Sequence, residues 1–266
     1  MTILDQIIAD TRDVVARRKR ERSMGALEDT PLFDRTIRPF EERLRGPELA
    51  FIAEAKKASP SKGVIREDYD PANIGRQYEE AGASAMSVLT EPLYFQGSLD
   101  HLVAVREAVD LPLLRKDFVI DPYQIFEARA YGADAVLLIA AVLDRGHLSE
   151  LHSAADELGL ACLVEVYEAK ELDKLDFDQV RILGVNNRDL RTFEVDIDHS
   201  LRVFAEAPEG LVCVSESGLR TAQDLAHLHA HGIDAVLIGE TFMREKRPGD
   251  MLMRLREEME RVASVD

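Results

Sequence analysis

From about Ala50 onward, short apolar runs alternate with longer segments in which apolar residues recur every three or four positions. The short runs are rich in Val, Ile, Leu and Ala, which is typical of strands buried on both faces. The longer segments have the spacing of amphipathic helices. The predicted strands are Phe51–Lys56, Ala85–Leu89, Leu113–Lys116, Ala135–Ile139, Ala161–Val166, Arg181–Asn186, Leu211–Ser215 and Ala235–Ile238. The predicted helices are Pro71–Ala81, Leu99–Val109, Pro122–Tyr131, Leu148–Leu158, Thr221–His231 and Met251–Val262.

Many of these helices end at a glycine that lies a few residues before the next strand, as in EEAGASA, AYGADAV and AHGIDAV. Such a glycine is typical of a short helix-to-strand loop. Eight strand–helix units predict an α/β fold, a closed (βα)8 TIM barrel, rather than an open doubly wound sheet. An open sheet is expected to carry GxGxxG after its first strand, and this sequence has none there. We expect a single domain over residues 1–266, with 1–49 as an N-terminal helical extension packed on a barrel of residues 50–266.

The chain carries a formal net charge of −17, which argues against a nucleic-acid partner. We interpret the basic run Arg17–Arg20 as a solvated helix face. No apolar run approaches membrane-spanning length, and the N-terminus does not resemble a signal peptide. Cys162 and Cys213 lie in apolar runs without a CxxC partner, and the histidines form no HExxH cluster. We therefore expect a cytoplasmic protein with small, reduced core cysteines, no metal site and no membrane contact.

Charged residues lie at the ends of several predicted strands, where the active sites of such barrels are found. Alternate strands contribute side chains to the same layer of the barrel, and side chains two apart share a face. The residues expected to converge over the mouth are Glu54, Lys56, Lys116, Glu165 and Glu216, with Asn186 and Arg188 at the end of strand six. Three carboxylates would then face three cations. An alternative is a salt-bridge network that only caps the barrel, but apolar residues would close this layer at a lower free-energy cost.

The loops after strands seven and eight predict a phosphate site, because barrels of this type bind phosphate there. The candidate residues are Ser217, Gly218, Gly239 and Glu240, with Glu240–Arg244 as a short extra helix. Ser59 and Ser61, in the loop after strand one, offer hydroxyl donors to the same anion. Phe95 and Phe118 follow strands two and three, and we expect them to stack on an aromatic substrate.

The segments that carry these residues closely resemble the indole-3-glycerol-phosphate synthase family. They are IAEAKKASPSKG, RKDFVIDPYQIFEARAYGADAVLLI, LVEV, GVNNRDLRTFEVD and VSESGL, and the likeness covers nearly the whole chain. The motifs AEAKKASPSKG and GVNNRDL are specific, whereas SESG and LIG are shared among phosphate-binding barrels. One departure is Lys57, where the family often has Arg. The resemblance implies an enzyme of tryptophan biosynthesis.

The family converts 1-(2-carboxyphenylamino)-1-deoxyribulose 5-phosphate to indole-3-glycerol phosphate, carbon dioxide and water. The resemblance implies that Lys116 is the general acid and Glu165 the general base, assisted by Glu54 and Lys56. It implies that Lys56 and Arg188 hold the anthranilate carboxylate. Asn186 would orient Glu165, and Glu216 and Ser217 would complete the pocket. It further implies a small phosphorylated substrate, no metal or organic cofactor, and a monomer or weak homo-oligomer.

Three other interpretations share parts of this pattern. Phosphoribosylanthranilate isomerase has a similar barrel and phosphate site, but that family carries a Cys/Asp acid–base pair where this chain has Glu54 and Asn186. The tryptophan synthase α subunit lacks the EAKKASPSKG segment. A non-catalytic barrel that binds a phosphorylated ligand is disfavoured, because all the expected acids and bases are present.

Overall fold

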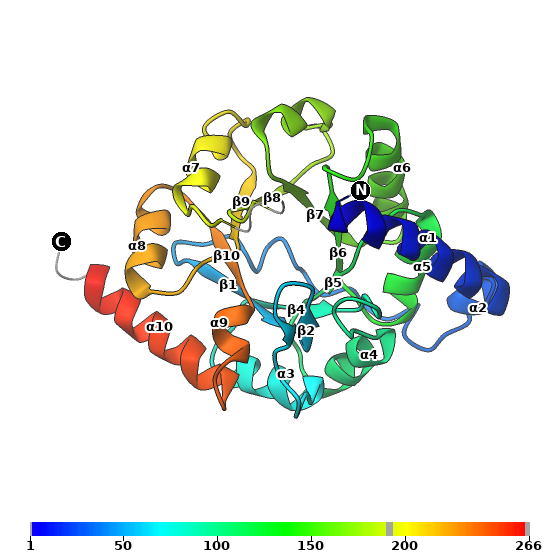
Figure 1. Ribbon diagram of the computed structural model, residues 1–266, viewed down its shortest axis with the longest axis horizontal. Coiled ribbons are helices and arrows are strands. Elements are labelled where there is room, and N and C mark those ends of the chain that lie inside the picture. The colour runs from blue at the N-terminus through cyan, green and yellow to red at the C-terminus, as the bar shows by residue number, and fades with distance from the viewer. Residues whose placement is uncertain (1, 190–193, 264–266) are drawn as a thin grey trace.

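A computed structural model describes residues 2–189 and 194–263, and within them eight parallel strands close into a barrel. Helices surround the strands (Figure 1), which confirms the predicted TIM barrel. The order around the barrel is β1-β10-β9-β8-β7-β6-β5-β4. The barrel strands are β1 (Ala50–Ala55), β4 (Ala85–Leu89), β5 (Leu113–Lys116), β6 (Ala135–Ile139), β7 (Ala161–Val166), β8 (Ile182–Asn186), β9 (Val212–Glu216) and β10 (Ala235–Ile238).

The predicted helices are present with small shifts in their ends. Asp-Pro pairs begin two of them, because the Asp70 and Asp121 carboxylates accept backbone N–H groups of the first turn. The helices are α1 (Ile3–Glu21), α2 (Met24–Glu28), α3 (Pro71–Glu80), α4 (Leu99–Ala108), α5 (Pro122–Ala130), α6 (Arg145–Glu157), the 3-10 helix η1 (Ala169–Lys174), α7 (Asp198–Phe204), α8 (Ala222–Ala230), α9 (Glu240–Met243) and α10 (Pro248–Ala263). No helix in the described part of the chain is both long and apolar enough to cross a bilayer.

Some elements were not predicted from the sequence. The loop after β1 folds into a small hairpin of β2 (Ala58–Ser59) and β3 (Gly63–Val64). Strand β9 ends one residue later than predicted, so Glu216 belongs to the strand itself. Helix α6 begins three residues earlier than predicted, because Asp144 caps it by accepting the His147 N–H at 2.9 Å.

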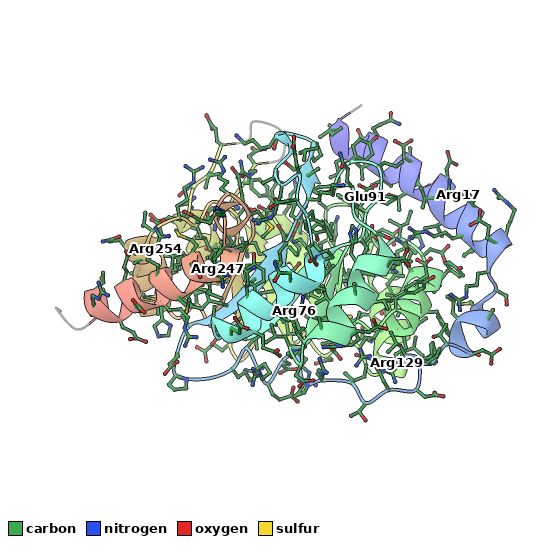
Figure 2. The ribbon with its side chains drawn as sticks, turned by 90° about the horizontal axis from the view of Figure 1, so that it is seen from below. Arg17, Arg76, Glu91, Arg129, Arg247 and Arg254 are labelled. Atoms are coloured by element: carbon green, nitrogen blue, oxygen red, sulfur yellow. The ribbon has the colours of Figure 1, made fainter. Side chains whose placement is uncertain are left out.

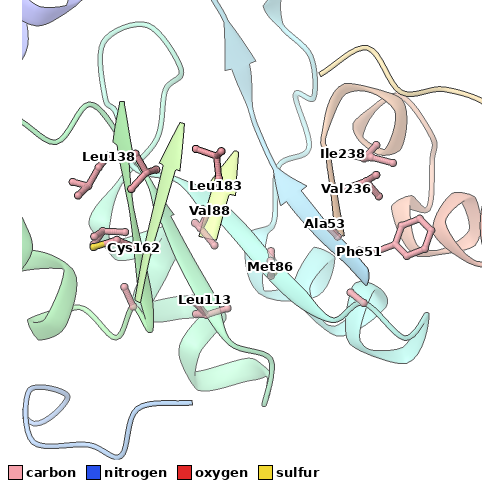
Figure 3. Close-up of a cluster of buried hydrophobic side chains, with 14 of the residues drawn as sticks. Phe51, Ala53, Met86, Val88, Leu113, Leu138, Cys162, Leu183, Val236 and Ile238 are labelled. Carbon is pink, nitrogen blue, oxygen red and sulfur yellow. The ribbon is translucent and has the colours of Figure 1, made fainter. Parts of the chain in front are cut away.

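Side chains of the strands fill two apolar layers. Inside the barrel, residues such as Ile52, Leu114 and Leu163 pack against one another. On the outer face, Val88, Leu113 and Leu138 pack against the helices (Figure 3). Cys162 is buried in this outer layer, which confirms it as a core residue, whereas Cys213 is only partly buried and packs against that layer. The two layers leave the carboxyl ends of the strands as the place for polar chemistry.

Polar side chains close the base of the barrel in a repeated way. Gly82, Gly132 and Gly232 end their helices with positive φ, and a polar residue follows each two positions later. That residue accepts the N–H of a residue at the start of the preceding barrel strand. The pairs are Ser84 with Phe51 at 3.2 Å, Asp134 with Leu113 at 2.8 Å, and Asp234 with Cys213 at 2.7 Å.

The N-terminal extension is bonded to the barrel at two levels. Near α5, Arg18 pairs with Glu127 at 3.3 Å and Lys19 with Asp121 at 2.6 Å. The expectation that Arg17–Arg20 is a solvated face is therefore wrong for Arg18, which is partly buried, whereas Lys19 stays exposed, as does Arg17 on α1 (Figure 2). At the base, buried Asp134 accepts from Arg35 and Arg106, each at 2.7 Å, and from the Arg38 N–H at 2.8 Å. We call Asp134 and these three arginines the base cluster.

Candidate active site

A cavity of about 440 Å³ opens at the carboxyl ends of the barrel strands. Its wall contains side chains from the strand ends and their loops, together with Ile3, Leu4 and Ile7 of α1. A volume of this size holds a drug-sized organic molecule. The structure places every residue that the sequence singled out on this wall: Glu54, Lys56, Ser59, Ser61, Phe95, Lys116, Phe118, Glu165, Asn186, Arg188, Glu216, Ser217, Gly218, Gly239 and Glu240.

A cluster of charged side chains forms the floor of the cavity. Lys116 on β5 donates to Glu216 of β9 at 2.8 Å and to Glu165 of β7 at 3.2 Å. Lys56, just after β1, donates to Glu54 at 2.6 Å. We call these five residues the mouth cluster. They come from alternate strands of the barrel, as the period-two pattern predicts.

The mouth cluster changes the proton affinity of its members. Burial by itself lowers the pKa of Lys116, but the carboxylates of Glu216 and Glu165 outweigh it and raise that pKa well above its usual value. Burial raises the pKa of Glu216, Lys116 opposes the rise and Glu165 adds to it, and the pKa lies at about 8. At neutral pH, Lys116 is therefore an ammonium ion, and Glu216 takes up a proton more readily than an exposed glutamate does.

The expected balance of three carboxylates and three cations is wrong. The structure pairs Arg188 with Glu240 at 3.5 Å, so the mouth cluster holds three carboxylates and two lysines. Glu240 also forms an ion pair with Arg244, one turn further along. The cause is the position of α9, whose first residue Glu240 brings a carboxylate to the loop after β8. Residues 190–193, within the GVNNRDLRTFEVD motif, lie outside the described residues.

Two glycines make room for the carboxylates of the cluster. A Cβ on Gly184 of β8 would overlap Oε1 of Glu216, and one on Gly239 would overlap the carboxylate of Glu54. Gly184 was not singled out from the sequence. The signal that could have identified Gly184 is its place inside an apolar strand, since a glycine there often marks a close approach by another group. For Gly239, the expected reason was an approach by phosphate, and the structure adds contact with Glu54.

The loops after β8 and β9 are held by buried hydrogen bonds. Ser217 has φ of 70°, a left-handed conformation that is uncommon outside glycine and often found at functional sites. Asn187 donates to Ser215 at 2.9 Å and to the Ser217 carbonyl at 3.3 Å, and sequence reasoning missed it. Asn186 accepts the Arg188 N–H at 3.0 Å, so the hydrogen bond that the structure shows for its side chain lies within its own loop rather than on Glu165.

Two aromatic rings form one side of the cavity. Phe95 and Phe118 lie 6.1 Å apart between ring centroids and are tilted by 42°. Both are partly buried and line the wall. This arrangement offers apolar surface to a flat ring.

Comparisons with known proteins agree along the whole chain. The family model described as Indole-3-glycerol phosphate synthase matches residues 4–255. An indole-3-glycerol phosphate synthase of Salinibacter ruber is 57% identical over 266 residues, covering 99% of this chain and 98% of that protein. One of Rhodopirellula baltica is 49% identical over 250 residues, covering 92% and 95%.

Solved structures of other proteins share the fold at low identity. Tryptophan synthase subunit alpha of Legionella pneumophila aligns with a TM-score of 0.63 at 13% identity, over 85% of this chain and 100% of that chain. The 3-hexulose-6-phosphate synthase of Salmonella typhimurium aligns with a TM-score of 0.65 at 13% identity, over 80% and 99%. These likenesses show the barrel fold.

Proposed function

The chain belongs to the indole-3-glycerol phosphate synthase family, and we infer that its cavity carries out the family's step of tryptophan biosynthesis. The reaction converts 1-(2-carboxyphenylamino)-1-deoxyribulose 5-phosphate to indole-3-glycerol phosphate, carbon dioxide and water, so the chain is a carboxy-lyase. The observation that best supports a chemical role is Lys116, an ammonium ion placed between Glu165 and Glu216 on the cavity floor.

Ring closure requires a proton donor at the ribulose carbonyl. As the aromatic carbon that bears the carboxylate attacks this carbonyl, its oxygen gains negative charge and must be protonated. We assign that proton to Lys116, whose raised pKa keeps it charged at neutral pH. Glu54 and Lys56 lie beside it and assist the proton transfers.

Dehydration requires an acid and a base together. Loss of carbon dioxide restores the benzene ring, and the new hydroxyl then departs as water when it is protonated, while a base removes a proton so that the new five-membered ring becomes aromatic. We assign the base to Glu165, which lies within hydrogen-bond distance of Lys116. Glu216, whose pKa is raised by burial, is a second group that can pass a proton at the same place.

The two anionic groups of the substrate are assigned to different sets of residues in the cavity. We place the phosphate at Ser217, Gly218 and Gly239. Gly239 is the N-cap of α9 and has no side chain of its own to occupy the first N–H groups. Ser59 and Ser61, on the loop after β1, line the cavity and add hydroxyl donors. The anthranilate carboxylate is assigned to Lys56 and Arg188, with Glu240 as the present partner of Arg188.

The aromatic ring of the substrate is placed against Phe95 and Phe118, whose faces line the cavity. We further propose that the protein works in the cytoplasm, as one domain and as a monomer or weak homo-oligomer, without a nucleic-acid or membrane partner. The acidic net charge of −17 and the two free cysteines support this setting.

The test is to add the named substrate and follow the rise of indole-type fluorescence. The wild-type chain should form the product, and Glu165→Gln should form it far more slowly. Parallel assays with phosphoribosylanthranilate and with indole-3-glycerol phosphate should give no reaction. A folded wild-type chain that binds the substrate but forms no indole product would show a non-catalytic barrel and overturn the proposal.

A further inference from the structure

Strand β5 carries a buried arginine where its neighbours carry valine. Arg115 lies in the outer layer of the barrel, and the residues aligned with it on β4 and β6 are Val88 and Val136. It is fully buried. Burying a guanidinium is unfavourable unless it is paired, and an apolar side chain would fill this layer more cheaply. The position of Arg115 therefore calls for an explanation other than stability.

Arg115 is fully engaged by buried partners. It donates to Asp117 at 2.9 Å, to Glu127 at 3.1 Å and to the Gln124 carbonyl at 2.6 Å, while its Nε donates to the Thr90 hydroxyl at 3.1 Å. The Thr90 hydroxyl in turn donates to Asp117 at 2.6 Å. We call these five residues the Arg115 network.

The Arg115 network holds the backbone around Lys116. The Thr90 N–H donates to the Lys116 carbonyl at 3.0 Å. Asp117 accepts the N–H of Phe118 at 2.9 Å, and the Gln124 side chain donates to the Phe118 carbonyl at 2.9 Å. The Lys116 carbonyl is thus held by the main chain of Thr90, and the N–H and carbonyl groups of Phe118 are held by side chains of the network.

We propose that the Arg115 network positions the catalytic acid: Asp117, held by Arg115 and Thr90, fixes the backbone that places Lys116 between Glu165 and Glu216 and Phe118 on the cavity wall. The inference rests on the proposed function, since it treats Lys116 as the acid. Asp117 and Phe118 line the cavity, whereas Thr90 and Arg115 lie behind it and act through Asp117. A misplacement of about 1 Å is enough to slow a reaction about 100-fold, so such support matters to turnover.

The network also extends to the N-terminal extension. Arg18 of α1 pairs with Glu127 at 3.3 Å, on the same carboxylate oxygen that accepts from Arg115. With Arg18 included, two arginines balance the carboxylates of Asp117 and Glu127. Helix α1 is thereby connected, through side chains, to the backbone of the acid.

The experiment compares two substitutions at one buried hydroxyl. Thr90→Val keeps the shape but removes the hydroxyl that joins Arg115 to Asp117, whereas Thr90→Ser keeps it. We expect Thr90→Val to lower kcat about 10-fold with KM nearly unchanged. Thr90→Ser should have nearly the kcat of the wild-type chain. Thr11→Val makes the same change at a buried threonine of α1 whose hydroxyl contacts its own helix, and should leave kcat unchanged. Asp117→Asn should act like Thr90→Val.

A pH profile separates positioning from loss of stability. If Lys116 moves away from its carboxylates, its pKa falls, so the alkaline limb of kcat should move to lower pH in Thr90→Val and not in Thr90→Ser. If Thr90→Val lowers the melting temperature but leaves kcat and the alkaline limb of its pH profile unchanged, the inference is overturned. If Thr90→Val fails to fold, an unchanged kcat in Asp117→Asn would overturn it instead. An inactive wild-type chain would instead count against the proposed function.

Discussion

Two buried carboxylates at opposite ends of the barrel differ in how completely they are hydrogen-bonded. Asp134, in the base cluster, accepts at both oxygens: Oδ1 from Arg35 and the Arg38 N–H, and Oδ2 from Arg106 and the Leu113 N–H. Glu216, in the mouth cluster, accepts from Lys116 at Oε2, while its Oε1 has no partner within the described residues. Both carboxylates are almost fully buried.

The difference separates a site that stabilises from a site that reacts. An unsatisfied buried polar atom costs about 1–3 kcal/mol, and the base cluster carries this cost at Arg35 Nε and Arg106 Nε but not at its carboxylate. Both carboxylate oxygens of Asp134 in the base cluster are hydrogen-bonded. The mouth cluster leaves the buried Oε1 of Glu216 without a hydrogen-bond donor and holds more carboxylates than lysines, so a proton or hydroxyl of the substrate can complete it.

The largest expected effect is on turnover at the mouth. Lys116→Met and Glu165→Gln should each lower kcat about 10²–10⁴-fold, because an acid or a base of the reaction is lost. Substrate affinity should change far less, since other groups are assigned to the two anions. Steady-state kinetics with the fluorescent product measures both. Near-normal kcat in either variant would remove that residue from the chemistry.

The next effect is on stability at the base. Asp134→Asn should lower the free energy of unfolding by about 3–5 kcal/mol, because it leaves buried arginines without their counter-charge. The kcat of the folded protein should be unchanged. Chemical denaturation measures the first quantity, with exposed Asp173→Asn as the matched control. If turnover fell and stability did not, the roles of the two ends would have to be exchanged.

A smaller effect is expected from filling the space beside Glu216. The added methyl group of Gly184→Ala would meet Glu216 and lie 3.1 Å from Leu163, so the carboxylate must move. We expect kcat to fall about 10–100-fold. Gly25→Ala is the control, because nothing lies within 4 Å of its added Cβ. Unchanged kcat in Gly184→Ala would mean that the position of Glu216 does not limit the reaction.

The last expected effect is a change in how stability depends on pH. The folded-state pKa of Glu216 is raised to about 8, above an unfolded value of about 4.3. Its contribution to stability is therefore fully present below the unfolded pKa and is lost as the pH rises through the folded pKa. In Glu216→Gln, the free energy of unfolding should no longer decline between the unfolded and folded pKa values of Glu216. Unfolding curves measured across that window would show equal slopes for both proteins if Glu216 titrates normally.

The sequence was sufficient for the barrel and for the convergence of the mouth cluster. Both follow from local rules: apolar periodicity assigns strands and helices, and the alternation of side chains puts Lys116 and Glu165 on the same inner face. A closed barrel then brings alternate strand ends together without any knowledge of loop structure.

What the sequence did not reveal depends on contacts between distant segments. The pairing of Arg188 with Glu240 depends on where α9 begins after β10, and the base cluster joins Arg35 to a residue 99 positions away. Gly184 acquires its meaning from Glu216 on the neighbouring strand. The Arg115 network was hidden for a related reason: alternation puts Arg115 on the outer face, but its partners Thr90 and Glu127 come from other segments of the chain.

The state of Lys116 also governs which side reactions the enzyme avoids. The substrate carries a ketone, and a neutral lysine amine beside a ketone forms a Schiff base. The carboxylates around Lys116 keep it as an ammonium ion, which has no lone pair with which to attack. In the proposed mechanism, the same charges that make Lys116 a proton donor therefore also protect the enzyme from being trapped by its own substrate as a covalent imine.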